Sequence, residues 1–441
     1  MKKRTAKLCM AAVCVSLLAG CGNSGNSNDS GNGKSSNESG SEEERTITVL
    51  HNLNEDSAIQ WLDAVTADFE EQNPGIKVDM EVLASDDYNS MLRNKIASDD
   101  VPDLFFLNDI NKMGEFIEAG LCQDLSGESW LEENVQESAI EACRSEDGTV
   151  NVVPLFIGGM YVTYNKDVFQ AAGIEEVPET WSGFIQACKK IQESGVAAIA
   201  CGYQDAWTIY SAEQCDSIVT TLKNDPENRI DLEAGTTTFT EDKGKFSEVL
   251  SRMKESYQYT NSDPFGTDWN TAVSMLATGE AGMIINGSWT ASAVVNVNPD
   301  VNIGIFPLPL TENEEDALLP LHTNSGGFAV YSESERKDDA LAFAECLSTP
   351  ESGALMQELK GDISASKNVE VPEDSLLYEV TRYIEEDRVF DWSGYTEQFV
   401  SDELQQITTD VEVELLTSDM TVEEALKKLD EKFAAALSAQ K

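Results

Sequence analysis

The chain has 441 residues, of which 41% are hydrophobic, and its formal net charge at pH 7 is -50. That length is enough for two domains or two large lobes, and the hydrophobic content is ordinary for a folded globular protein. A surface of this charge repels nucleic acid and anionic lipid, so the composition excludes a nucleic-acid-binding protein.

Residues 1–20 have the pattern of an export signal. A cationic start is followed by an apolar run, Leu8 to Leu18, that is too short for a permanent membrane helix. Small residues then precede Cys21, and this junction resembles the bacterial lipobox, in which the cysteine receives a diacylglyceryl group before the leader is removed. We predict a lipoprotein signal peptide over 1–20 and a two-chain anchor on Cys21. An ordinary secretory signal is the alternative.

Residues 21–45 are predicted to form a flexible, lipid-anchored linker, because Gly, Ser and Asn dominate and nothing from Gly22 to Glu44 is apolar. The cysteines beyond Cys21 are Cys122, Cys143, Cys188, Cys201, Cys215 and Cys346. They could form up to three disulfides, but we favour buried free thiols. With no C-x-x-C pair and with only His51 and His322 as histidines, we expect no metal and no cofactor.

Strand and helix patterns alternate from Thr46 onward, which predicts an α/β layer architecture. Strands are predicted over 46–50, 76–83, 102–107, 150–154, 160–164, 196–201, 279–285, 303–307 and 327–331. Helices are predicted over 59–69, 88–97, 178–191, 272–278, 337–349, 351–359, 376–384, 396–416 and 422–437, and a further helix opens at 286–289. Asn108 and Asp109 follow the buried strand 102–107, and open α/β sheets bind ligands at such carboxyl ends.

Three stretches carry a family resemblance: 102–109, 164–181 with its Tyr-Asn-Lys-Asp start, and the Gly-Glu-Ala-Gly to Trp289 segment 279–289. Together, behind a lipobox, they resemble the extracellular solute-binding proteins of family 1. These are the sugar-binding lipoproteins of ABC importers, with maltose-binding protein as a distant member. The resemblance covers essentially the whole chain after Thr46.

The resemblance implies a two-lobed periplasmic-binding-protein type II fold, in which each lobe is a mixed sheet flanked by helices and the ligand lies in the cleft between the lobes. Carried onto this chain, lobe 1 holds 46–156 with 326–372, and lobe 2 holds 157–325 with 373–441. It also implies a monomer on the extracellular face of the bacterial membrane that captures a carbohydrate, by our prediction an oligosaccharide, and delivers it to ABC permease subunits. No catalysis is implied.

A sugar site needs flat aromatic platforms and polar side chains that both donate and accept hydrogen bonds. The ligand contacts predicted from the resemblance and from strand ends are Asn54, Glu55, Asn108, Asp109, Tyr161, Gln204, Asp205, Trp207, Trp289, Gly326, Gly327, Trp392 and Tyr395. For Tyr161 a place in the core is equally open. A helix cap or a solvated loop is the alternative for the polar residues, and a plain turn for the two glycines.

Two departures prevent the transfer of sugar specificity: Leu107 replaces an aromatic of maltose-binding protein, and Gly158-Gly159 replace an acidic position. A surface glycoside hydrolase using two carboxylates is the competing function. However, the chain has no G-x-S-x-G, H-E-x-x-H or P-loop motif. A third alternative keeps the fold but changes the ligand to a polyamine or a peptide.

Overall fold

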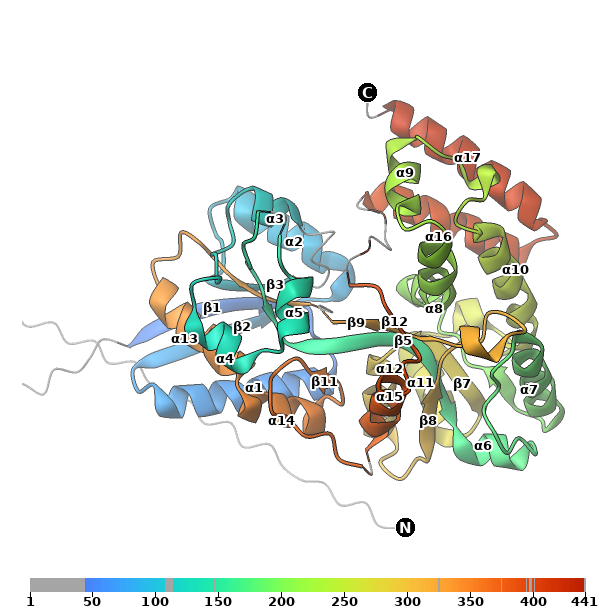
Figure 1. The fold of residues 1–441 in the computed structure, drawn as a ribbon, viewed down its shortest axis with the longest axis horizontal. Helices are drawn as coiled ribbons and strands as arrows, with labels where there is room; N and C mark the ends of the chain where they lie inside the picture. The colour runs from blue at the N-terminus through green and yellow to red at the C-terminus, as the bar shows by residue number, and fades with distance from the viewer. Residues whose placement is uncertain are drawn as a thin grey trace, which may run out of the picture. The chain divides into compact units, whose positions relative to one another are not determined.

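Within the described residues, two mixed β-sheets with separate hydrophobic cores organise the chain (Figure 1). The computed structural model describes residues 44–107, 114–145, 147–323, 326–373, 375–393, 395, 399 and 401–439. The predicted signal peptide, Cys21 and most of the predicted linker lie outside this part. The predicted α/β fold class is confirmed, since both sheets are mixed and flanked by helices.

The first sheet has the strand order β2-β1-β3-β10-β4. Strands β1 and β2 are parallel, as are β1 and β3, whereas β10 runs antiparallel to both β3 and β4. Its strands are β1 (Arg45–His51), β2 (Ile76–Val82), β3 (Leu104–Leu107), β4 (Val153–Pro154) and β10 (Gly327–Val330). The helices nearest in sequence to these strands are α1 (Asp56–Gln72), α2 (Ser85–Ala97), α3 (Gly114–Glu118), α4 (Ser129–Asn134), α5 (Glu137–Ala142), α13 (Lys337–Ser348) and α14 (Pro350–Leu359).

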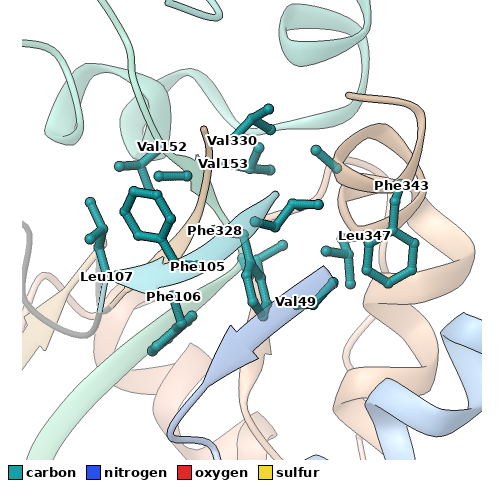
Figure 2. Packing of buried hydrophobic residues seen from close by; sticks show 14 of the residues in the cluster. Val49, Phe105, Phe106, Leu107, Val152, Val153, Phe328, Val330, Phe343 and Leu347 are labelled. Atoms are coloured by element: carbon teal, nitrogen blue, oxygen red, sulfur yellow. The ribbon is translucent and has the colours of Figure 1, made fainter. Parts of the chain in front are cut away.

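The core of the first sheet forms around its central strands β3 and β10, whose residues are all buried (Figure 2). Figure 2 labels Phe106 and Phe328 in this core. Their rings pack edge to face, with centroids 5.3 Å apart. A side chain at Gly327 would collide with the carbonyl oxygen of Val153 on β4. Glycine therefore permits the close approach of β10 to the edge strand β4.

The second sheet has the order β12-β9-β5-β7-β6, and β8 and β11 also pair with β5. Its strands are β5 (Phe156–Asn165), β6 (Ala197–Ile199), β7 (Ala281–Gly287), β8 (Ile303–Phe306), β9 (Leu319–His322), β11 (Ile363–Ser364) and β12 (Val389–Asp391). Among the described residues the chain passes between the sheets at β4–β5, at β9–β10 and at α14–β11. The lobe boundaries drawn from the resemblance stay a prediction.

Most of the remaining helices are long and gather with the second sheet (Figure 1). They are α6 (Lys166–Ala171), α7 (Trp181–Glu193), α8 (Trp207–Asn224), α9 (Asn228–Ala234), α10 (Phe246–Ser256), α11 (Trp269–Thr278), α12 (Trp289–Val297), α15 (Leu376–Glu385), α16 (Asp402–Thr417) and α17 (Val422–Ala439). The short 3-10 turns are η1 (Phe239–Glu241), η2 (Tyr257–Tyr259), η3 (Pro264–Gly266) and η4 (Glu314–Asp316).

One predicted helix boundary needs correction, and one long buried helix has no signal in the sequence pattern. Helix α8 was not predicted, because it is buried on all sides and many of its buried residues are polar, so it has no amphipathic stripe. Helix α16 begins at Asp402 and not at 396, because the Ser401 side chain accepts a hydrogen bond from the Leu404 N–H and caps it there. The predicted strand 150–154 is shorter in the structure, where only Val153–Pro154 form strand β4.

The six cysteines after Cys21 are all free thiols in the part of the chain that the structure describes, and all but the half-buried Cys346 are buried. Burial raises the pKa of Cys122, Cys188 and Cys201 to about 12. These thiols therefore stay protonated and unreactive at neutral pH. None of the helices in the described part of the chain is long and apolar enough to span a lipid bilayer.

Candidate functional site

Two predicted tryptophans meet at one edge of the second sheet. Trp207 opens α8 after β6, and Trp289 opens α12 after β7. Strands β6 and β7 are parallel, with Ile199 opposite Met283. Because parallel strands end at the same edge, both rings come to that edge, and their centroids lie 6.2 Å apart.

A third tryptophan, Trp269, joins them and was missed from the sequence. It opens α11, and the segment before it runs beside β6, since Thr260 bridges in parallel to Ile199. Its ring lies edge to face with Trp207 at a centroid distance of 5.1 Å and an interplanar angle of 61°. A signal for Trp269 was present in the sequence, because Asp268 is a typical N-cap residue directly before it. Trp207 and Trp289 likewise occupy the first positions of their helices, α8 and α12.

We call Trp207, Trp269 and Trp289 the tryptophan cluster. Each ring is half-buried, and none of the three indole N–H groups has a hydrogen-bond partner among the described residues. A side chain at Gly287 would collide with the ring of Trp289, so glycine lets that ring fold back over the strand end. Flat apolar faces beside unused N–H donors match the alternation of C–H patches and hydroxyls on a sugar.

The loop between β6 and α8 holds the predicted residues Gln204 and Asp205. The Asp205 carboxylate accepts a hydrogen bond from the backbone N–H of Trp269 at 2.7 Å. The backbone N–H of Gln204 donates to the carbonyl of Thr267 at 3.1 Å, and its side chain is exposed. The helix-cap alternative for Asp205 is therefore present in the structure, and the loop is tied to the start of α11.

A second group of predicted residues lies where α1 begins. Asn54 is exposed, and Glu55 is half-buried next to the first residue of α1. The buried Lys360, which the sequence reasoning missed, pairs with Asp362 and lies 4.4 Å from the ring centroid of Phe156. Burial lowers the pKa of Lys360 to about 8, and the nearby Glu55 carboxylate opposes this shift.

The segment around Lys360 also lies next to the helix that carries Trp289. A side-chain Cβ at Gly361 would be 3.5 Å from the Cβ of Ser292 on α12. Helix α12 packs against α1 as well. These contacts bring the start of α1 and the tryptophan-bearing end of the second sheet into one neighbourhood, although the two groups belong to different sheets.

Tyr161 and Trp392 are placed in the core of the second sheet. Tyr161 on β5 is 3% exposed, and Trp392 is 6% exposed. The Trp392 ring stacks on His322 with centroids 3.8 Å apart and an interplanar angle of 5°. Burial lowers the pKa of His322 to about 3, so the stacked imidazole is neutral at physiological pH. Tyr395 is half-buried and stacks on Phe390 at 6.1 Å.

Two predicted residues, Gly326 and Gly327, lie at the end of β3. Gly326 has a φ of 124° and lies against Phe106 and the carbonyl oxygen of Leu107. A residue other than glycine would be strained there and would also be crowded. Asn108 and Asp109, which directly follow Leu107, lie outside the described residues.

A small cavity of about 40 Å³ has Trp269 in its wall, together with Tyr203, Asp216, Arg252 and Asn286. It has room for water but not for a sugar ring. Arg252 closes an ion pair with Asp216 at 2.6 Å beside it. In the described part of the chain, no group of three or more His, Cys, Asp or Glu side chains could hold a metal ion.

Comparisons with known proteins agree with this architecture. The sequence pattern of the family described as bacterial extracellular solute-binding protein matches residues 54–354. The multiple sugar-binding protein of Streptococcus mutans is 25% identical over 339 residues, which cover 76% of this chain and 78% of that protein. The melibiose/raffinose/stachyose-binding protein of Bacillus subtilis is 24% identical over 331 residues, covering 74% and 75%. The solved structure of the solute-binding protein RafE in complex with raffinose has a TM-score of 0.71 and 25% identity, covering 88% of this chain and 99% of that one.

Proposed function

Because this chain belongs to the bacterial extracellular solute-binding protein family, we propose that it captures an oligosaccharide outside the cell and delivers it to the permease of an ABC importer. Two relatives support the choice of ligand, since their names describe binding of multiple sugars and of melibiose, raffinose and stachyose. A structural neighbour holds raffinose. The protein releases its ligand unchanged and does not act as an enzyme.

The observation that carries the proposal is the tryptophan cluster. Its three rings come from the starts of three helices, and the ring of Trp207 lies 5.1 Å from that of Trp269 and 6.2 Å from that of Trp289. All three are half-buried, with unused indole N–H donors among the described residues. Such rings stack on the C–H faces of sugar rings and donate to hydroxyls. A single monosaccharide covers about one ring, so several rings favour a ligand of more than one unit.

Polar partners complete the proposed site. Glu55 and Asn54 are proposed to bind hydroxyls from the α1 side, where the buried Lys360 lies near Glu55. Asn108 and Asp109 are proposed to do the same from the end of β3. Carboxylate oxygens accept paired hydrogen bonds from neighbouring hydroxyls, which suits this role.

The proposed receptor is a monomer held at the membrane by a diacylglyceryl group on Cys21. Its two lobes are proposed to follow the predicted boundaries and to close on the ligand. The linker 21–45 is short and polar, so it only tethers the folded part to the membrane. The anchor therefore keeps the receptor, and any sugar that it releases, close to the permease.

A thermal-shift screen followed by calorimetric titration tests the proposed function. The panel contains melibiose, raffinose, stachyose and β-linked oligosaccharides. Spermidine is included to test the alternative that the ligand is a polyamine. A bound sugar at one hundred times its Kd should stabilise the fold by about 2.7 kcal/mol. Stabilisation by spermidine alone would overturn the sugar proposal, and sugar fragments in the incubated sample would identify an enzyme.

A further inference from the structure

We propose that Asp205 is a positioning residue, which sets the geometry of the tryptophan cluster by joining the starts of α8 and α11. This inference rests on the proposed function, since the cluster is the proposed sugar platform. It assigns Asp205 a role through Trp269 in place of the direct ligand contact that its position after β6 predicts.

The backbone of Asp205 is fixed at the entrance to α8. Its N–H donates to the carbonyl of Gly202 at 3.0 Å, and its own carbonyl accepts from the N–H of Thr208 at 3.0 Å. The Thr208 hydroxyl adds a bond of 2.8 Å to the same carbonyl. Trp207 lies between Asp205 and Thr208 in the chain, so this turn fixes where the Trp207 ring leaves the backbone.

The side chain of Asp205 reaches the other helix. Its carboxylate accepts from the Trp269 N–H at 2.7 Å, across 64 residues of sequence. The first N–H groups of a helix have no partner within the helix, and they attract negative charge. Asp268 binds the Thr271 N–H at 2.7 Å, so the two aspartates serve different donors of α11.

The backbones of the two loops are also in close contact. A Cβ at Gly202 would lie 2.9 Å from the Cα of Trp269 and from the backbone of Asp268. If the loop that carries Asp205 moved away from α11, the hydrogen bond between the Asp205 carboxylate and the Trp269 N–H would be lost. The Asp205 carboxylate thus adds to the Gln204–Thr267 backbone bond a side-chain bond that reaches Trp269 itself, and it orients the edge-to-face contact of Trp207 and Trp269 before any ligand binds. Such preorganisation favours affinity.

The test uses the full chain in detergent, with variants Asp205→Ala and Asp205→Asn and the matched control Asp268→Ala. Asp268→Ala removes an acidic cap from the same helix, but that cap does not reach α8. The first readout is the circular-dichroism couplet of the closely spaced indoles in ligand-free protein. We expect Asp205→Ala to weaken the couplet, Asp205→Asn to keep it through its amide oxygen, and Asp268→Ala to change it less than Asp205→Ala does.

The second readout is the affinity for the sugar that binds best, measured in a double-mutant cycle that combines Asp205→Ala with Trp269→Ala. We expect Asp205→Ala to weaken binding about tenfold in the wild-type background and to add nothing once Trp269 is removed. Additive losses would show a direct ligand contact and overturn the inference, as would equal effects of Asp205→Ala and Asp268→Ala on the couplet. If no sugar binds, the proposed function fails, while the ligand-free couplet still decides the positioning role.

Discussion

At Trp289, the contribution of the side chain to ligand binding can be measured separately from its contribution to the stability of the fold. Its ring is half-buried, lies over Gly287 and contacts Trp207, and it packs against the edge of a core cluster without being part of its buried set. A ring in this place can lose its ligand contacts on truncation while the sheet beneath it stays intact. Trp392, by contrast, is fully enclosed and stacked on His322.

We expect Trp289→Ala to weaken sugar binding by about 2 kcal/mol or more, which is roughly thirtyfold, because a stacking aromatic is lost. The melting temperature of the ligand-free protein should change little. Trp181→Ala is the control, since Trp181 opens α7, stacks on Phe184 and donates to Glu255, so its loss should leave affinity unchanged. Calorimetry beside thermal melting measures both. A collapsed melting temperature with Trp289→Ala would place this ring in the core.

Helix α16 carries a buried carboxyl group, Glu412, close to Glu213 of α8 and Arg229 of α9. Glu412 is 1% exposed, and neither of its carboxyl oxygens has a hydrogen-bond partner in the described part of the chain. Burial raises the pKa of Glu412 well above its usual range, the neighbouring Glu213 adds to the shift, and Arg229 opposes it. Burial raises the pKa of Glu213 too, but Arg229 binds Glu213 at 2.8 Å, so the proton belongs on Glu412.

This pair predicts that the fold loses stability as the pH rises. A carboxyl group with a folded pKa above its unfolded value stabilises fully below the unfolded pKa, about 4.3, and less as the pH rises toward the folded pKa. The loss is at most about 1.4 kcal/mol per pH unit. Urea unfolding at pH 5 and pH 8 should show a smaller pH dependence in Glu412→Gln than in wild type. Glu403→Gln, at an exposed position of α16, should match wild type. Equal slopes in all three proteins would refute the assignment.

At the scale of the whole molecule, the described chain crosses between its two sheets at β4–β5, β9–β10 and α14–β11. Each sheet has its own core. We propose that each moves as a unit when the short crossing segments change their dihedral angles. The Trp289 helix α12 contacts α1, and its Ser292 lies next to Gly361 in the α14–β11 crossing. A ligand held by residues of both sheets would therefore bias the relative position of the two units.

Small-angle scattering should show a smaller radius of gyration when the best-binding sugar saturates the protein, because the lobes are proposed to close. The same sugar concentration should compact Trp289→Ala less than wild type, because weaker binding leaves a smaller share of the variant occupied. A saturated wild-type protein with an unaltered scattering curve would exclude closure but not binding.

The anchor makes a prediction about the cell. Cys21→Ala should abolish lipid attachment, because the acceptor thiol is lost, and the protein should be shed or keep its leader. Cys14→Ala, which changes a cysteine within the predicted leader, should leave lipidation intact. Mass spectrometry of the N-terminal peptide distinguishes the products. Diacylglycerol on the Cys21→Ala protein would exclude this anchoring site.

Much of the local structure was predictable from the sequence alone, because it depends on residues close together in the chain. The predicted strands 46–50 and 76–83 and the helix between them are confirmed as β1, β2 and α1, since their apolar spacing encodes strand and helix directly. The positions of Trp207 and Trp289 after strands were also predictable, because a strand followed by a turn can be recognised locally.

Only the tertiary structure decided which of these residues meet. The bond from Asp205 to Trp269 spans 64 residues, and the pairing of β6 with β7 that aligns Trp207 with Trp289 joins segments that are even farther apart in the chain. The buried helix α8, the Lys360–Asp362 pair and the enclosed Tyr161 and Trp392 likewise depend on what packs around them. Periodicity reports the direction in which a side chain leaves its own element, whereas burial and partnership depend on the other elements that the fold brings against it.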